Sequence, residues 1–449
     1  MNRVFNEHSV LQDGCLTLAL APALTPEGLE NSPEFFRGTA RYPQVLARGL
    51  LILADITAAR YFRYTPQSQR DPILSAQGDI LRAECFSACC GVYARLDLLG
   101  DGFEGEIRRG TTNVDIGAEL RTALNRIKKQ DKLHLIIGSD GLSAAHLSEE
   151  NQGGSTLAYA KERPVQMPDR WVRALGNAAE IHQTMEPVLT VKGMQAQMLI
   201  ASLPPAAGRQ QAGWLTLTSS GVSLMPRASS GAVYVSGLHR LSALKRVMTD
   251  LSSLTFYMQK NGLPGACMAE AELPGARLTL SLTAESWQGY SGEGALLSAL
   301  AHQDVLEDAE SVASELSFDS VIDQLSIARR WGMNQNRVKA ALAVIAVSGK
   351  AGFDAHDRTY FHRELPDDPD RVMKDNPRLT GARRLMDHVK PNGPRQWIVS
   401  SGNADYRVSF SGDRDARGAE CTCTWYLNHQ NRRGPCKHIL AVQIKEGIR

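Results

Sequence analysis

The sequence predicts an α+β protein built from several domains. Its 449 residues exceed what one hydrophobic core usually serves and correspond to about three domains of ordinary size. Patterns typical of β-hairpins and of helices follow one another without the strand–helix–strand rhythm that builds a parallel sheet. Hydrophobic residues make up 43% and charged residues 22% of the chain, so it can bury sizeable cores. We therefore expect a large N-terminal α+β region followed by smaller modules.

The N-terminal region, residues 1–310, is expected to contain one or two subdomains. Its first forty residues look irregular. The spacing of apolar residues then predicts a helix over 43–63, strands over 71–99, a hairpin over 133–147, a hairpin over 214–225, a helix over 239–258 and a strand over 277–282. Residues 110–115 lack the lysine of a phosphate-binding loop and are expected to form a turn. Cys85, Cys89 and Cys90 are interpreted as small core residues on strands.

Residues 311–366 are expected to form a winged-helix-like module. One helix is predicted over 318–331, and a second from Asn334, a good N-cap residue, to Gly349, a good residue for ending a helix. Two short strands after the second helix would form the wing.

Charge and hydropathy argue that this module does not read the DNA major groove. Its second helix offers only Arg337 and Lys339 as cations, and the wing carries Asp354 and Asp357. A recognition helix normally directs several basic or amide side chains to base edges and phosphates. The outer face of the second helix becomes apolar towards its end, so we expect the module to pack against another domain or a partner.

A polar and basic connector, residues 367–394, leads to a C-terminal module over 395–449. Residues 371–449 include 15 basic and 7 acidic residues, a net charge of +8, whereas the whole chain has a net charge of only +2. Any affinity for a polyanion should therefore lie at the C-terminus.

Cysteine and histidine residues of the C-terminal module have the spacing of a metal site. Two pairs, Cys421-Thr-Cys423 and Cys436-Lys-His438, are separated by twelve residues. Three thiolates and one imidazole supply the four tetrahedral ligands that zinc prefers. A knuckle at Thr422 can bring the first two sulfurs together, whereas residues i and i+2 of a helix diverge by about 200°. Cys436 is therefore expected at or before a helix N-terminus, with His438 in the first turn.

Such a zinc ion would be structural, because four protein ligands leave no open position for water. His429, between the two pairs, is a weaker alternative ligand. Buried thiols beside a surface histidine are the other interpretation, and three cysteines within sixteen residues argue against it. No Gly-x-Ser-x-Gly, dinucleotide-binding or His-Glu-x-x-His motif occurs, so no catalytic residue is assigned and we expect a protein that is not an enzyme.

These motifs make the C-terminal module resemble the SWIM zinc finger, a strand–strand–helix unit. The matching segments are Trp397-Ile-Val, Cys421-Thr-Cys423 and Cys436-Lys-His438-Ile-Leu-Ala441, and residues 35–38, 86–97, 110–115 and 360–366 resemble bacterial SWIM zinc finger family proteins. The resemblance implies structural Zn²⁺ on Cys421, Cys423, Cys436 and His438, and a module that binds nucleic acid or protein. It also implies work beside a MoxR-type AAA+ ATPase and a von Willebrand A domain protein.

Two functions are expected from these observations. In the first, the C-terminal module binds nucleic acid, with DNA favoured over RNA. Its contact residues would be Trp425, Tyr426, Arg432, Arg433 and Lys437, because aromatic rings stack on bases and cations neutralise phosphates. Alternatively, both aromatic residues only cover the zinc core. In the second function, the protein is a protein-interaction adaptor without nucleic acid; an enzymatic N-terminal region is a third interpretation.

The location expected from the sequence is the cytoplasm, without membrane contact. No segment approaches the roughly 18 apolar residues that span a bilayer. The N-terminus lacks the layout of a signal peptide. Eight sparse, unevenly clustered cysteines indicate reduced thiols or metal ligands and not a disulfide framework.

Overall fold

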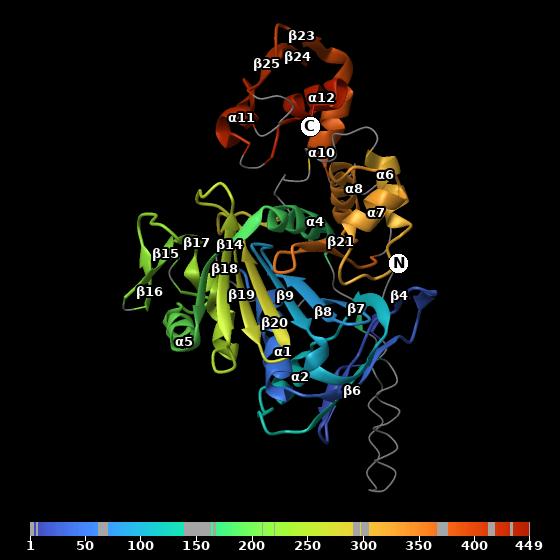
Figure 1. Ribbon diagram of the computed structural model, residues 1–449, viewed down its shortest axis with the longest axis vertical. Coiled ribbons are helices and arrows are strands. Elements are labelled where there is room, and N and C mark those ends of the chain that lie inside the picture. The colour runs from blue at the N-terminus through green and yellow to red at the C-terminus, as the bar shows by residue number, and fades with distance from the viewer. Residues whose placement is uncertain are drawn as a thin grey trace.

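The computed structural model describes residues 4–5, 8–61, 71–138, 163–164, 168–208, 210–219, 221–290, 297, 305–365, 376–411, 418–431 and 434–448. Within these residues the chain combines helices with mostly antiparallel sheets, which confirms the α+β class. Figure 1 shows a broad β-rich body, a group of helices beside it and a C-terminal module at the far end. No described helix is long and apolar enough to cross a membrane.

The body is organised around a ten-stranded antiparallel sheet, here called the main sheet. Its strands, in order across the sheet, are β14 (Met185–Lys192), β18 (Ser253–Gln259), β19 (Cys267–Leu273), β20 (Ala276–Leu282), β9 (Val92–Leu98), β8 (Leu81–Phe86), β7 (Ile73–Gln77), β11 (Arg109–Asn113), β4 (Ala23–Thr25) and β5 (Gly28–Glu30). Every residue of β8, β9 and β20 is buried. Both faces of the sheet centre are therefore covered.

Helices cover one face of the main sheet. The longest is α1 (Pro43–Ala58), whose Pro43 lies in the first turn, where its missing N–H leaves no helical bond unmade. Twelve of its sixteen residues are buried, so the helix is covered on nearly all sides, and it packs on β8 and β9. The other elements on this side are α2 (Ala118–Leu124), α5 (Gly193–Ser202) and the 3-10 helix η2 (Leu238–Val247).

Smaller sheets flank the main sheet. A five-stranded sheet has the order β10 (Phe103–Ile107), β6 (Glu34–Ala40), β12 (Leu133–Gly138), β3 (Cys15–Leu18), β2 (Val10–Gln12), and a three-stranded sheet has the order β16 (Gly221–Met225), β15 (Ala212–Thr218), β17 (Val233–Ser236). β1 (Val4–Phe5) pairs with β13 (Arg163–Pro164), and a 3-10 helix η1 (Gly100–Gly102) precedes β10. The predicted hairpin over 214–225 is confirmed as β15–β16.

Several sequence expectations for this region are wrong. The first forty residues are not irregular, because most of them lie in strands β1–β6. The helix predicted over 239–258 is a 3-10 helix followed by strand β18, because residues 253–259 pair with both β14 and β19. Residues 110–115 form no turn, since Thr111 and Thr112 lie within β11 and pair with β7. The second strand of the hairpin predicted over 133–147 lies outside the described residues.

A helix and a hairpin cover the opposite face of the main sheet. They are α4 (Asp169–Gln183) and the pair β21 (Ala351–Asp354) and β22 (Thr359–His362). Asp354 accepts ion pairs from Arg82, Arg95 and Arg277 of the sheet at 3.3, 2.9 and 3.2 Å. Asp97 pairs with the first two of these arginines at 2.6 and 2.9 Å. We call these five side chains, all buried, the buried ion cluster.

The helix–turn–helix–hairpin order expected for residues 311–366 is present, whereas the assignment as a winged helix stays a prediction. α6 (Val305–Ala313) precedes α7 (Gln324–Arg330) and α8 (Gln335–Val347). α7 begins later than predicted because the Asp323 carboxylate caps it, accepting hydrogen bonds from two backbone N–H groups at 3.0 Å. The Asn334 side chain caps α8, and Gly349 follows it with a φ of 78°, as the sequence predicts.

The outer end of α8 is covered, as its apolar residues predict. Lys339 is exposed, but Ala343 and Val347 are buried and α8 packs against α4. The strands of the wing are covered as well, since β21 and β22 are buried and Asp354 belongs to the buried ion cluster. The tip of the wing is exposed, and Asp357 there pairs with Arg277 at 3.0 Å. The module therefore packs the strands of its wing and the end of its second helix against the rest of the molecule.

In its described residues the C-terminal module consists of a four-stranded antiparallel sheet, three α-helices and one 3-10 helix. They are α10 (Pro377–Leu385), the 3-10 helix η6 (Met386–His388), β23 (Val389–Pro391), β24 (Gln396–Ser401), β25 (Ala404–Phe410), β26 (Ala419–Cys421), α11 (Thr424–His429) and α12 (Lys437–Glu446). Ile439, Leu440 and Val442 of α12 are fully buried, and α12 packs on both α10 and the sheet. The described part of the basic connector therefore belongs structurally to this module.

Candidate metal centre

The first pair of predicted ligands lies where strand β26 passes into helix α11. Cys421 is the last residue of β26, and Cys423 caps α11, its sulfur accepting the Tyr426 backbone N–H at 3.4 Å. Thr422 between them is fixed to β25: its N–H donates to the Arg407 carbonyl at 3.1 Å, and its hydroxyl accepts the Arg407 N–H at 3.0 Å. These two hydrogen bonds to the neighbouring strand fix the backbone of the predicted knuckle.

The second pair lies at the start of α12, as the spacing predicts. Cys436 is the N-cap residue of this helix with extended backbone dihedrals, and His438 lies in its first turn. The chain reaches Cys436 through a turn in which Gly434 has a φ of 73° and donates its N–H to Asn431 at 2.9 Å. The Asn431 amide in turn donates to the Ala419 carbonyl at 2.7 Å, which ties this turn to β26.

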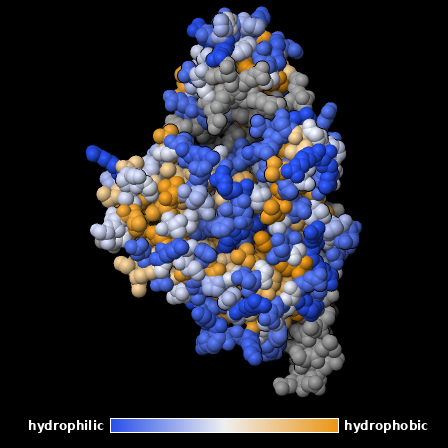
Figure 2. All heavy atoms as spheres, viewed as in Figure 1, coloured by the Kyte–Doolittle hydropathy of each residue, from blue (hydrophilic) through white to orange (hydrophobic). Residues whose placement is uncertain are grey.

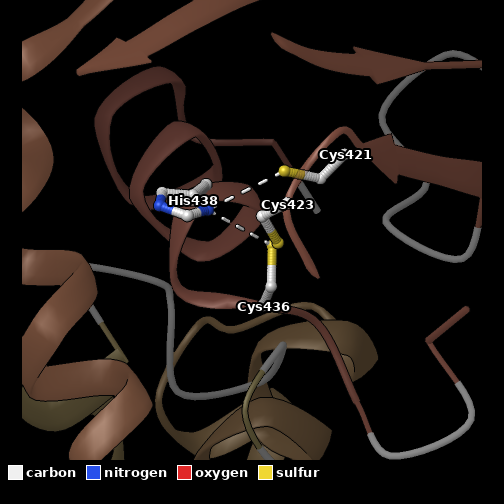
Figure 3. A group of neighbouring side chains, drawn as sticks. All are labelled: Cys421, Cys423, Cys436 and His438. Carbon is white, nitrogen blue, oxygen red and sulfur yellow. Dashed lines mark hydrogen bonds between the residues drawn. The ribbon is translucent and has the colours of Figure 1, made fainter. Parts of the chain in front are cut away.

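The four side chains converge on one point (Figure 3). Their ligand atoms all lie within 4.8 Å of one another, and His438 Nδ1 is 3.8 Å from the sulfur of Cys421 and 4.0 Å from that of Cys436. Zn–S bonds of about 2.3 Å in a tetrahedron place sulfurs about 3.8 Å apart. Each residue is at most 4% exposed. A closed, buried set of three sulfurs and one imidazole nitrogen fits structural Zn²⁺, which would cross-link β26, α11 and α12.

The thiols interact strongly with one another. The hydrogen bonds that Cys423 accepts from Cys421 and Cys436 hold the pKa of Cys423 well below its ordinary value, and the first of them raises the pKa of Cys421. The Cys421 bond acts to lower the pKa of Cys436, but Cys423 and burial outweigh it and raise that pKa to about 11. Since zinc binds thiolates, its binding releases the protons that these sulfurs still hold.

The aromatic ring of Tyr406 orients His438. The two rings are stacked with centroids 4.2 Å apart and planes at 21°. This contact covers one face of the imidazole and leaves Nδ1 directed at the sulfurs. Sequence reasoning did not identify Tyr406 as part of the site; its position in a strand next to β26 was the only available signal.

The predicted contact residues do not form one exposed group. Trp425 is half-buried, with the Arg378 guanidinium 4.5 Å and the His429 ring 4.4 Å from its ring centre. Tyr426 is half-buried, and Lys437 donates from Nζ to the Ser401 hydroxyl at 3.0 Å. Arg432 and Arg433 lie outside the described residues. Trp425 therefore packs against the module, and His429, beside it, does not belong to the metal-binding group.

The segment between the two ligand pairs, residues 424–435, begins with a helix, α11. The Cys423 cap starts this helix, and Gln430 in a left-handed conformation ends it. The aromatic residues are consequently displayed from a helix and not from an open loop.

Exposed cations lie elsewhere on this module. Arg383 and Arg384 end α10, while Lys390 and Arg407 lie on β23 and β25. In the sheet register Lys390 lies opposite Ile398, which lies opposite Arg407, so all three point to the same side. The residues next to them in sequence, Val389, Val399 and Val408, are buried and alternate with them. Sequence reasoning missed Lys390 and Arg407, although this alternation was visible in the sequence.

The comparison that identifies a family concerns the C-terminal module. Residues 406–445 match the family model of the SWIM zinc finger. No curated protein matches the chain. Among solved structures, Proliferating Cellular Nuclear Antigen from Entamoeba histolytica is similar over 56% of this chain and 99% of its own, with 11% identity and a TM-score of 0.32. The PCNA2–PCNA3 complex from Sulfolobus tokodaii is similar over 56% of this chain and 100% of its own, with 11% identity and a TM-score of 0.35.

At these scores neither structural likeness carries a conclusion for this chain. The family match and the ligand geometry agree with each other, because the matched residues contain the four converging side chains and Tyr406. Zinc binding and interaction with nucleic acid or protein follow from this assignment. The C-terminal module of the chain is a SWIM zinc finger with a Cys₃His site suited to structural Zn²⁺.

Proposed function

We propose that this chain is a non-enzymatic interaction protein whose SWIM zinc finger module binds nucleic acid, DNA in preference to RNA. One observation carries the proposal. The exposed cations Arg383, Arg384, Lys390 and Arg407 have no carboxylate within ion-pair distance among the described residues. Such cations are available to neutralise phosphates and to release the counterions that drive binding to a polyanion.

Many arginines outside the C-terminal module are engaged differently. Arg48 pairs with Asp250 at 2.5 Å, Arg246 with Asp55 at 2.6 Å and Arg337 with Asp308 at 2.5 Å, in addition to those of the buried ion cluster. A cation that already has a carboxylate partner gains little from a phosphate. The contrast supports the C-terminal module as the place where a polyanion binds.

The experiment is a titration of zinc-loaded, full-length protein into labelled mixed-sequence duplex DNA, followed by fluorescence anisotropy. The test variant replaces Arg383, Arg384, Lys390 and Arg407 by alanine. Each phosphate contact contributes about 0.9 units to the log–log salt slope, so four lost contacts reduce the slope by up to about 3.6. Competition with RNA of the same sequence tests the preference for DNA.

A matched control carries four alanines at exposed cations of the body, Arg126, Lys128, Lys129 and Lys132. It has the same net charge as the test variant and should bind like the wild type. Zinc content is measured in all three proteins. A test variant that keeps its zinc and binds DNA with wild-type affinity and salt slope would contradict the proposal.

The second candidate function is that of a protein-interaction adaptor without nucleic acid. It would work with a MoxR-type AAA+ ATPase and a von Willebrand A domain protein. Its support in the structure is Leu427 of α11, an apolar side chain of the finger that is 65% exposed. If the wild type binds neither DNA nor RNA at low salt, this account replaces the first. Leu427→Asp should then weaken co-sedimentation with the two purified proteins, while zinc content stays unchanged.

We place the protein in the cytoplasm. The described residues include no disulfide, and three of the cysteines form the zinc site. Free thiols and thiolate ligands persist in a reducing compartment. Fractionation of cells that produce the protein tests this assignment.

A further inference from the structure

One lobe of the body is almost without charge. Helix α5 and the hairpin β15–β16 lie within residues 193–225, which we call the uncharged lobe. Arg209 is the only charged residue in this stretch, although 22% of the whole chain is charged, a fraction that corresponds to about seven residues. A surface lobe that lacks charge in this way does not have the usual composition of a solvated surface.

Several large apolar side chains of the uncharged lobe are exposed. Met194 and Met198 on α5 are 70% and 58% exposed, and Leu217 and Met225 on the hairpin are 50% and 45% exposed. In Figure 2, apolar spheres gather on the left side of the molecule, where Figure 1 places β15, β16 and β17. Methionine is enriched at protein interfaces, and its flexible side chain adapts to a partner surface.

Strand β16 forms a free edge in this lobe. Among the described residues, the sheet order β16–β15–β17 leaves one side of β16 without a partner strand, and no backbone group of residues 221–225 bonds outside the hairpin. Its five residues contain no proline, no charge and no bulge. Natural edge strands usually carry such features, because a bare edge pairs with another strand.

The edges of the main sheet are protected, which sets β16 apart. β14 carries Glu186, Pro187 and Lys192 and has a register shift after Pro187. β5 ends in Glu30 and pairs over only three residues. These edges are protected and the edge of β16 is not, which indicates that β16 is available to pair with another strand.

We infer that the uncharged lobe binds a second copy of this chain, with the two β16 strands pairing antiparallel across a two-fold axis. A two-fold axis brings each central residue close to its own copy, so a charge there would meet a like charge. The uncharged lobe avoids that repulsion because it has almost no charged residues. The paired sheet would have six strands, in the order β17–β15–β16 and then the same strands of the partner reversed.

Full overlap of the two five-residue strands fixes the register. Ser223 lies on the axis opposite Ser223 of the partner subunit, and Gly221 lies opposite Met225 of the partner subunit. Ser223 is half-buried, and its side chain makes no hydrogen bond to a described residue. It is therefore the position at which an added charge acts most directly on pairing and least on the hairpin.

The test is the mass of the full chain in solution, by sedimentation velocity. At roughly 100 µM protein a dimer with a Kd of about 1 µM is almost fully formed. The wild type should sediment at twice the 49.1 kDa of one chain. Ser223→Lys and Ser223→Glu should each be monomeric, and an equimolar mixture of the two should return to the dimer. The control is Leu263→Lys, at an exposed apolar position between β18 and β19, and it should remain dimeric.

A second variant protects the test against a folding defect at Ser223. Met198→Lys with Met225→Lys leaves the central residue of β16 unchanged and should weaken the dimer at least tenfold. Circular dichroism confirms that each variant is folded. A wild type that is monomeric at this concentration would overturn the inference, and so would a dimer whose mass is unchanged in folded Ser223→Lys and in the double methionine variant.

Discussion

The zinc ligands depend on side chains that bind no metal themselves. Tyr406 stacks on His438, and Thr422 fixes the strand end between Cys421 and Cys423. Residues that orient metal ligands commonly change metal affinity by tenfold or more when they are altered. The ligands were predictable because they lie in two short, regularly spaced pairs. Tyr406 was not, because its contact with His438 spans two strands and a helix.

Replacement of Cys436 by serine should remove zinc and unfold the C-terminal module alone. Structural zinc contributes on the order of 10 kcal/mol of apparent binding free energy at neutral pH, more than so small a core can replace. Metal analysis should show loss of the ion, and limited proteolysis should cut within residues 376–448 while the body stays intact. Retention of stoichiometric zinc by this variant would show that Cys436 is not a ligand.

Replacement of Tyr406 by alanine should lower zinc affinity by about tenfold, because the imidazole loses the ring that orients it. Tyr406→Phe is the matched control and should bind zinc like the wild type, since it keeps the stacked ring. Competition with a fluorescent chelator measures both affinities. Equal affinity in the alanine and phenylalanine variants would assign the ring a role in packing only.

Glu180 on α4 makes stability depend on pH near neutrality. Burial raises its pKa to about 7. Because the folded pKa is above the unfolded one, the folded protein is favoured by protonation below the unfolded value of about 4.3, and this advantage is lost as pH rises towards 7. Glu180→Gln should therefore be more stable than the wild type above pH 7, by about 1–3 kcal/mol, and nearly equal to it at pH 5. Urea unfolding at both pH values measures the difference, and a difference that does not change with pH would contradict it.

At the scale of elements, local signals were reliable and long-range pairing was not. The caps of α8 at Asn334 and Gly349 follow from single residues, and the structure confirms both. Residues 253–259 were misassigned as helix because their partner strands, β14 and β19, determine their conformation. No pattern within residues 351–363 indicated which arginines the hairpin would meet.

The buried ion cluster should contribute strongly to stability through Asp354. Burial acts to raise the pKa of this carboxyl, but Arg95, Arg82 and Arg277 outweigh it and hold the pKa well below its usual range. Asp354→Asn leaves these buried cations with too little negative charge and should lower the free energy of unfolding by about 3–5 kcal/mol. The carboxylate contribution is present above the unfolded pKa of about 3.9 and is lost as pH falls below it, so the variant and the wild type should converge in acid.

Asp357→Asn is the matched control for that measurement. The Asp357 side chain is 41% exposed, and among the described residues its carboxylate pairs with Arg277 alone, at 3.0 Å. Water reaches this carboxylate and screens the pair, so we expect its loss to cost about 0–1 kcal/mol. Chemical unfolding at pH 7 should therefore separate the two variants clearly. A loss of less than 1 kcal/mol for Asp354→Asn would mean that water or a neighbouring acid replaces its charge.

At the scale of the whole molecule, the body and the winged-helix-like module of residues 311–366 are joined by ion pairs as well as by apolar contacts. Arg363 of the segment after β22 pairs with Glu84 of β8 at 2.8 Å, close to the buried ion cluster. These contacts cross the boundary expected at residue 310. The sequence alone suggested two separate units because nothing along the chain marks a contact between residues so far apart.

The same contacts set the order in which the body can mature during synthesis. Asp354 is made 272 residues after Arg82. At about 5–20 residues per second the ribosome needs roughly 14–54 s to cover that distance. During this time Arg82 and Arg95 lack the carboxylate that completes their burial, so this face of the sheet must stay hydrated. The β21–β22 hairpin therefore covers this face late in synthesis. A chain released before the hairpin emerges keeps this face of the main sheet exposed to water.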